Sequence, residues 1–497
     1  MRTPLQPSTA GEATVGRSLR LSKRVLDSQR AHRFRHGLLI AVALSLVGRI
    51  DFASPASIQS DNPNDYVQVR DGRFMLAGKP FVIKGTNYFG GWRYHQSIDT
   101  GNGIEFHTIW AFYHDWDDQK LDMDMQFIHA QLNATTLRVG TPAQADFADL
   151  VQFHDYQPWY APDGRITEQY KAELIKIADA AYANGMRIQF CLLWNFKNEI
   201  AKDPDAFKLG ARMDTLYANQ VNSIVMALRS HPGVIGYSIG NEVLVDWPIN
   251  GTHPSAYEGQ AAGFILRRLK EVRAAAPRQL ITIDEVGNPT GKMWYAPELA
   301  FVTLADVDTG NGRQSIRLAD AADYLGTHFY PETLSPQDMT DGFASKIAEA
   351  TQKIAIYMQA AKAFGKPVVL NEFGLRISPE TLLPAQYSSI RDRFFQAILA
   401  EGQRQGLQGV LAWDAVPAFV LIPGQYTVKE STLNKFSPIE VDFDQPNHTQ
   451  RRMLFYKPEY SLFEWRSASD VPAATPAARA IASAWPDISQ PLQAPRP

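Results

Sequence analysis

The stretch EQYKAELIKIADAAYANGMRIQFCLLW, residues 168–194, contains a helical pattern followed directly by a strand pattern. In its first part, apolar residues recur at the three- and four-residue spacing of one helix face: Leu174, Ile177, Ala178 and Ala181. An Asn-Gly pair at 184–185 is a typical helix stop. The run RIQFCLLW, 187–194, is then almost continuously apolar, as expected for a strand buried on both faces.

The rest of the chain repeats this unit. The other strand-like runs are FVIKGTN (81–87), TTLRVG (135–140), VIGYSIGNE (234–242), LITIDE (280–285), YLGTHFY (324–330), PVVLNEFG (367–374) and GVLAWD (409–414). Helical patterns lie between them, for example at 345–367 and 390–406, each with a glycine at its end. Eight strands alternating with helices predict the α/β class and a (β/α)8 TIM barrel. An open doubly wound sheet is the alternative, but GTNYFGG does not match its G-x-G-x-x-G loop.

The predicted domains follow from this pattern. The barrel domain spans 63–465, after a signal or anchor and spacer at 1–62. The tail, 466–497, is rich in Pro and Ala, and we expect its last part, from 470, to be mostly irregular. Before the first barrel strand, VQVRDGRFML predicts a hairpin turned at Asp71-Gly72.

The N-terminal segment, about residues 17–56, has the features of a secretory signal. Basic residues precede the apolar run GLLIAVALSLVG (37–48), and small residues follow it. This run is shorter than the about 20 residues that span a bilayer. We therefore expect a secreted or cell-envelope protein cleaved after Ala56, with this segment as its membrane anchor if it remains uncleaved.

Composition excludes several classes of function. A net charge of -3, from 49 basic and 52 acidic residues, gives no reason to expect nucleic acid as a partner. The single cysteine, Cys191, excludes an internal disulfide and a cysteine-based metal site, and its apolar surroundings predict a buried, inert thiol. No His-Glu-x-x-His motif or Asp-rich calcium loop occurs, so we expect no metal and no cofactor. We expect a monomer.

Polar and aromatic side chains end most of the predicted strands. They are Arg138, Trp194, Asn195, Asn241, Glu242, His328, Tyr330, Glu372 and Trp413. In a TIM barrel the C-terminal ends of the strands form the active site, so these side chains should face one bowl. Two carboxyl groups at suitable spacing perform glycoside hydrolysis as acid and nucleophile. Tryptophan rings offer flat apolar faces to sugars.

The segments GNEV and LNEFG carry a resemblance to the glycoside hydrolases of clan A, and most closely to family 5, the cellulases and β-mannanases. It covers about residues 66 to 420 and implies that Glu242 is the acid/base and Glu372 the nucleophile of a retaining mechanism. Asn241 would bond the 2-hydroxyl of the sugar at the cleaved bond. The implied activity is hydrolysis of β-linked polysaccharide or oligosaccharide, foremost endo-acting on β-1,4-mannan, with a cellulase or β-glucanase as the alternative.

The resemblance also implies roles for the neighbouring side chains. Arg138 and Tyr330 would hold Glu372, and His328 would orient groups on the acid/base side. Trp413 would form the platform under the −1 sugar.

The chain departs from many family 5 members at the end of the third strand. Trp194 and Asn195 stand where those members have a histidine, which favours the mannanase-like branches over the cellulases. The long connection at 90–116 is rich in aromatics, and we expect Trp92, Trp110 or Trp116 to line the cleft.

Two other classes of function compete. The letters GYSIG, 236–240, spell the G-x-S-x-G of a serine esterase with Ser238 as nucleophile, but strand character continues past the serine. A barrel that binds glycan without cutting it is the second rival. Asp284-Glu285 also ends a strand and is a candidate for sugar binding.

Overall fold

The computed structural model describes residues 58–88, 116–143, 159–242, 255–286, 318–330, 344–375, 385–413, 462–465 and 472–486, with gaps at 195, 197–199 and 201–202. Between these ranges it describes residue 415 and the short strands at 98–99, 104–105, 307–308, 313–314, 418–419, 426–428, 439–443 and 451–455. The predicted N-terminal signal lies outside the described residues.

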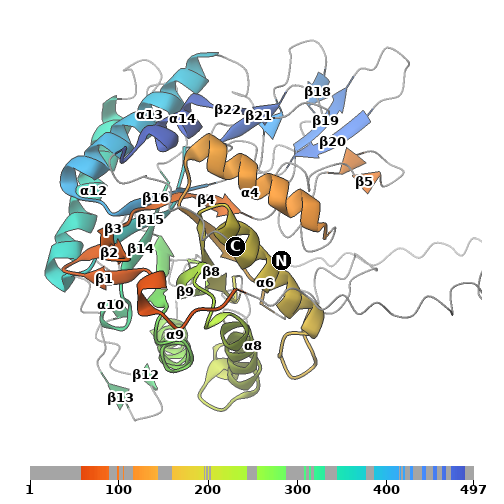
Figure 1. Cartoon of the computed structure of the whole chain (residues 1–497), viewed down its shortest axis with the longest axis vertical. Coiled ribbons are helices and arrows are strands. Elements are labelled where there is room, and N and C mark those ends of the chain that lie inside the picture. The colour runs from red at the N-terminus through yellow and green to blue at the C-terminus, as the bar shows by residue number, and fades with distance from the viewer. Residues whose placement is uncertain are drawn as a thin grey trace, which may run out of the picture. The chain divides into compact units, whose positions relative to one another are not determined.

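The core of the fold is a parallel sheet of nine strands in the order β10-β9-β8-β7-β4-β16-β15-β14-β11. These strands are β4 (Ile83–Tyr88), β7 (Thr136–Gly140), β8 (Arg187–Leu192), β9 (Val234–Ile239), β10 (Leu280–Thr282), β11 (Asp284–Val286), β14 (Leu325–Phe329), β15 (Val368–Phe373) and β16 (Gly409–Ala412). β10 and β11 follow each other along one segment, and they pair with β9 and with β14. The sheet therefore closes into a barrel of eight strand positions, and the predicted TIM barrel is confirmed (Figure 1).

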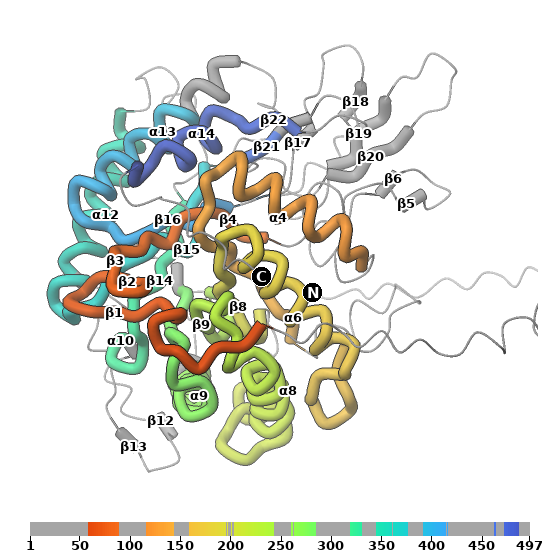
Figure 2. Tube along the Cα trace, in the orientation of Figure 1, coloured from red at the N-terminus to blue at the C-terminus, as the bar shows by residue number. Residues whose placement is uncertain are grey.

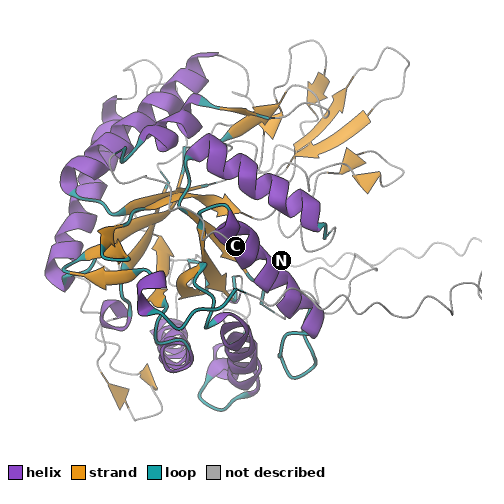
Figure 3. Ribbon diagram, viewed as in Figure 1, coloured by secondary structure: helices purple, strands orange, loops and turns teal. Residues whose placement is uncertain are grey.

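A helix follows each barrel position in the described chain. The helices are α4 (Asp118–Leu132), α6 (Glu168–Ala183), α8 (Arg212–Leu228), α9 (Ser255–Ala275), α10 (Leu318–Ala321), α12 (Ala344–Phe364), α13 (Ala385–Gln405) and α14 (Pro476–Ser483). Figure 3 shows these helices outside the strands. Two 3-10 turns, η1 (Pro63–Asp65) and η2 (Pro204–Phe207), lie in the connections.

Local sequence explains the elements that carry the site. Every residue of β8 and β9 is buried, as their continuous apolar runs predicted. In β9, a Cβ atom on Gly236 would lie 2.1 Å from the carbonyl oxygen of Leu280, so glycine permits the close approach of β10. Gly240 has φ +75°, which turns the chain as β9 ends.

The predicted hairpin precedes the barrel. β1 (Gln68–Arg70) pairs antiparallel with β2 (Arg73–Leu76), and a second turn leads into β3 (Lys79–Pro80). Asp71 and Gly72 both have positive φ, 50° and 69°, as a tight turn requires. The hairpin prediction is confirmed.

The expectation of a mostly irregular tail is wrong for its described part, because α14 and the short strand β22 (Ala473–Ala474) lie there. Thr475 caps α14 by accepting a bond from the backbone N–H of Ala478, and Pro476 occupies its first turn. Alanines and Ile481 bury one face, and α14 packs against α13 and α4, as Figure 2 shows. Proline here begins a helix rather than preventing one.

Lys84 fastens the end of this last helix to the first barrel strand. It is 1 % exposed, and its Nζ donates to the carbonyls of Ala482, at 3.3 Å, and Ala484, at 3.0 Å. Burial lowers the pKa of Lys84 to about 8. Cations are favourable near the carbonyls that end a helix, so the contact complements α14.

Smaller sheets are formed by the connections after the barrel strands. β5 (Ile98–Asp99) and β6 (Ile104–Glu105) follow β4, whereas β18 (Tyr426–Val428), β19 (Ile439–Phe443) and β20 (Arg451–Phe455) follow β16. These strands join in one sheet, ordered β18-β19-β20-β6-β5. The others are β17 (Ala418–Phe419) with β21 (Phe463–Trp465) and β22, and β12 (Val307–Asp308) with β13 (Arg313–Gln314). Within the described residues, no helix is long and apolar enough to span a bilayer.

Candidate active site

Eight of the ten side chains predicted for the site lie at the ends of barrel strands. Within or directly after β7, β9, β14, β15 and β16 are Arg138, Asn241, Glu242, His328, Tyr330, Glu372 and Trp413, and Trp194 follows the end of β8. The other two, Asn195 and Trp92, lie outside the described residues.

Glu372 is 4 % exposed and is contacted on both carboxylate oxygens. Nη1 of Arg138 donates to Oε1 at 2.6 Å, and the hydroxyl of Tyr330 donates to Oε2 at 2.7 Å. Nδ1 of His328 lies 3.5 Å from the same Oε2. Donors on both oxygens fix the position of this carboxylate at the end of β15.

Glu242 lies opposite, after β9, in the left-handed backbone region with φ +52°. Its backbone N–H donates to the carbonyl of Asp284 at 3.0 Å, which helps to hold this costly conformation. Its Oε1 lies 2.9 Å from Nδ1 of His328. The Glu242 side chain is 21 % exposed against 5 % for Glu372, so Glu242 is the carboxyl group with access to solvent protons.

The two carboxyl groups are close enough for a retaining mechanism. One oxygen of Glu242, one oxygen of Glu372 and one ring nitrogen of His328 all lie within 4.8 Å of one another. Retaining glycosidases hold their carboxyl groups about 5–5.5 Å apart, and inverting enzymes about 6.5–9.5 Å apart. A metal ion would also fit this spacing, but each carboxylate already has a protein hydrogen-bond partner, His328 for Glu242 and Tyr330 for Glu372.

Two tryptophans lie face to face beside the carboxylates. The rings of Trp194 and Trp413 stack with centroids 6.0 Å apart and an angle of 25° between their planes. The guanidinium carbon of Arg138 lies 4.5 Å from the centroid of the Trp194 ring. The tryptophan at the end of strand three therefore packs on the arginine that contacts Glu372.

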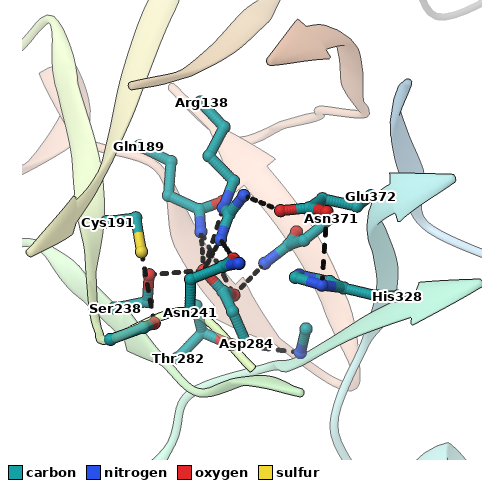
Figure 4. A network of polar contacts seen from close by, with 12 residues as sticks. Arg138, Gln189, Cys191, Ser238, Asn241, Thr282, Asp284, His328, Asn371 and Glu372 are labelled. Carbon is teal, nitrogen blue, oxygen red and sulfur yellow. Dashed lines mark hydrogen bonds and ion pairs between the residues drawn. The ribbon is translucent and has the colours of Figure 1, made fainter. Parts of the chain in front are cut away.

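Asp284 lies deeper in the barrel, and sequence reasoning misread it. Asp284 is 1 % exposed, and its Oδ2 accepts a hydrogen bond from Nε of Arg138 at 2.9 Å. It is therefore a buried partner of the arginine and not a sugar ligand (Figure 4). Asn87 was missed as well: its Oδ1 accepts from Nη1 of Arg138 at 2.8 Å. The available signal was a polar residue inside an apolar run, because buried polar groups need partners.

Ser238 is not placed as an esterase nucleophile. It lies within β9, is fully buried, and donates its hydroxyl to Asp284 at 2.5 Å. A nucleophile elbow would instead expose the serine on a strand-to-helix turn. The serine-hydrolase alternative is therefore wrong.

Arg138 concentrates positive charge under the site. Burial works to lower the pKa of Arg138, but the carboxylates of Asp284 and Glu372 raise it above its usual value. The guanidinium is fully buried, and its donors reach four side chains, so it remains charged and fixed in place.

One family model covers part of the chain that contains this candidate site. Residues 311–416 match the model described as GH family 5 beta-mannosidase-like. The match contains β14, β15 and β16, and with them His328, Glu372 and Trp413. The predicted resemblance to family 5 is confirmed. None of the curated proteins matches this sequence.

Solved structures share the fold. The exo-beta-1,4-mannosidase from Opitutaceae bacterium strain TAV5 is similar at 18% identity and TM-score 0.51, over 85% of this chain and 62% of that chain. The glycoside hydrolase family 5 mannosidase from Rhizomucor miehei is 13% identical with TM-score 0.51, over 86% of this chain and 98% of that chain. The endo-1,4-beta-mannanase from Rhizomucor miehei is 14% identical with TM-score 0.47, over 70% of this chain and 90% of that chain.

Proposed function

We propose, on the premise that this chain resembles glycoside hydrolase family 5, that it is a retaining hydrolase of β-linked, mannose-containing glycans. The observation that carries the proposal is the placement of Glu242 and Glu372 at the ends of β9 and β15, where one oxygen of each lies within 4.8 Å of the other. The matched family description and the mannosidases with the same fold support mannose as the sugar.

In the first step the Glu372 carboxylate attacks the anomeric carbon, and the bond from that carbon to the leaving oxygen breaks. Glu242, protonated, gives its proton to the leaving oxygen. The product is an ester between the sugar and Glu372. Glu242, now ionised, then takes a proton from water, whose oxygen attacks the anomeric carbon and frees Glu372. His328, 2.9 Å from Glu242, holds the acid/base in place through both steps.

Sequence reasoning favours endo action on β-1,4-mannan, but one observation favours the release of sugars from a chain end. The connections after β4 and β16 leave the catalytic face and join through the parallel pair β6–β20. We infer that a sheet linking two such connections closes one side of the site, and a site closed on one side suits a chain end. We therefore hold an exo-β-mannosidase as the second candidate.

The product distribution separates the two. An endo enzyme gives a range of oligosaccharides from β-1,4-mannan, whereas an exo enzyme gives mannose from mannan and from mannotriose. A parallel assay on β-glucan and xylan tests the cellulase alternative.

Two variants test the catalytic pair. Glu372→Ala should abolish hydrolysis of both mannan and an aryl β-mannoside, because no nucleophile remains. Glu242→Ala should still form the glycosyl ester from an aryl mannoside with a good leaving group, and added azide should then restore turnover as the β-mannosyl azide. Unchanged hydrolysis by Glu372→Ala would refute the nucleophile, and binding of mannan without hydrolysis by the unmodified protein would favour a glycan-binding barrel.

We also propose that the protein is exported through its N-terminal segment. The support is the basic flank, the apolar run at 37–48 and the small residues before residue 57. N-terminal sequencing of the expressed full chain should give Ser57 as the first residue. An intact N-terminus in a membrane fraction would instead indicate an anchor.

A further inference from the structure

Asp284 accepts hydrogen bonds from four buried side chains. Nε of Arg138 donates to Oδ2 at 2.9 Å and the hydroxyl of Ser238 donates to the same oxygen at 2.5 Å. Nδ2 of Asn371 donates to Oδ1, and Nε2 of Gln189 lies 3.3 Å from Oδ2. Figure 4 shows these groups gathered on one carboxylate below Glu372.

The other edge of the Arg138 guanidinium faces the proposed catalytic groups. Nη1 donates to Glu372 and Nη2 donates to Oδ1 of Asn241, each at 2.6 Å. Because the guanidinium is planar and rigid, the bonds from its Nε edge to Asp284 fix the directions of Nη1 and Nη2. Asp284 therefore influences, through Arg138, the positions of both Glu372, the proposed nucleophile, and Asn241, the predicted ligand of the 2-hydroxyl.

Two backbone features tie Asp284 to the same centre. Its carbonyl accepts the bond from the backbone N–H of Glu242 at 3.0 Å. Opposite it, Gly326 leaves room for the contact between Asp284 and Asn371, because a Cβ atom there would lie 2.6 Å from Oδ1 of Asp284 and 2.3 Å from Nδ2 of Asn371.

We propose that Asp284 is a positioning residue for the hydrolysis proposed above. Asp284 orients Arg138 toward Glu372 and partly neutralises the positive charge of the guanidinium, so that Glu372 remains a strong nucleophile. The proposal rests on that function. Asp284 is buried behind the arginine and acts only through it and through the backbone of Glu242.

The charges around Glu372 give the direction of the effect. Besides Arg138, the side chains of Tyr330, His328 and Glu242 face it from other strands, and Asp284 lies behind the guanidinium. With Asp284 neutral, the arginine would pair with Glu372 alone and would hold it more firmly as an anion. The carboxylate of Glu372 would then attack the anomeric carbon more slowly.

The test is Asp284→Asn, which keeps the shape and removes the charge. The rate of hydrolysis of 4-nitrophenyl β-mannoside is measured against pH, together with the rate of covalent inactivation by 2-deoxy-2-fluoro-β-mannosyl fluoride. We expect the acid limb of kcat/KM to move to lower pH by roughly one unit. We expect kcat and the inactivation rate to fall and KM to change little. Asp284→Ala, which also frees the guanidinium, should lose on the order of a hundredfold in kcat.

Asp214→Asn is the matched control. Asp214 is a buried aspartate of α8, paired with Arg267 of α9 at 2.9 Å, and it should lose stability without moving the acid limb. Ser238→Ala is the second variant, since it removes a donor from Asp284 and leaves the charge less compensated. Its acid limb should move to higher pH, opposite to that of Asp284→Asn.

The outcomes distinguish this proposal from the function beneath it. An active wild type with an unmoved acid limb in Asp284→Asn would overturn the positioning role alone. If Asp284→Asn does not fold, an unmoved limb in Ser238→Ala would overturn it. A wild type that neither hydrolyses nor is labelled by the fluorosugar would refute the glycosidase assignment, and the positioning role with it.

Discussion

The hydroxyl of Tyr330 donates a 2.7 Å hydrogen bond to Oε2 of Glu372. Tyr330 directly follows β14, and Glu372 lies near the end of the neighbouring strand β15. The phenol and the carboxylate therefore meet because two adjacent parallel strands end at the same level, and no other element is needed to bring them together.

Tyr330→Phe removes this donor and leaves the ring. We expect the acid limb of kcat/KM to move to higher pH by about one unit, because a hydrogen bond to a charged group is lost. The pH profile with an aryl β-mannoside checks this. Tyr217→Phe, in a buried tyrosine of α8 that packs on Phe264, is the control and should keep the wild-type profile. A limb that moves equally in both variants would contradict the role of Tyr330.

Removal of divalent metal ions should leave the activity unchanged. In the proposed mechanism Glu242 and Glu372 act as acid/base and nucleophile, and their partners His328 and Tyr330 are side chains of the protein. Dialysis against EDTA, followed by assay with and without added Mg²⁺, Ca²⁺ and Zn²⁺, measures this. Loss on dialysis with recovery on one cation would show that the proposed acid/base pair is incomplete by itself.

The thiol of Cys191 should be unreactive in the folded protein. Cys191 is fully buried in β8, and burial raises its pKa to about 12. At pH 8 a thiol reagent should therefore label it only as fast as the barrel opens, and at once in denaturant. Rapid labelling of the native protein would show that β8 is accessible from solvent.

The sequence was sufficient for the barrel because continuous apolar runs mark strands buried on both faces. RIQFCL and VIGYSI became β8 and β9 with every residue buried. Their ends also predicted which side chains would lie together, since parallel strands of one barrel carry their last residues to one face.

The contacts beneath the site were beyond sequence reasoning. Asp284 and Asn371 are 87 positions apart in the chain, and only strand register brings them together across the barrel. Polar residues such as Gln189 inside apolar runs indicated that partners exist, but not which ones. The prediction of an irregular tail was wrong because it used the content of Pro and Ala and not their order in the chain. Thr475 followed by Pro476 is the start of a helix.

Removal of α14 should destabilise the barrel although it lies far along the chain from the catalytic residues. A variant ending at residue 470 loses the apolar face of α14, including Ile481, which is fully buried, and Trp485, which is 8 % exposed. The lost burial is on the order of 5 kcal/mol. It also uncovers Lys84, whose Nζ bonds Ala482 and Ala484.

The melting temperature should fall by several degrees in this variant, with activity retained only at lower temperature. Thermal unfolding followed by circular dichroism, with residual activity after heating, measures both effects. A second variant ending at residue 486 keeps α14, Trp485 and the carbonyls that Lys84 contacts, and it should melt close to the full chain. Equal melting of the variant ending at 470 and the full chain would show that the packing of α14 on α13 and α4 contributes nothing to the stability of the barrel.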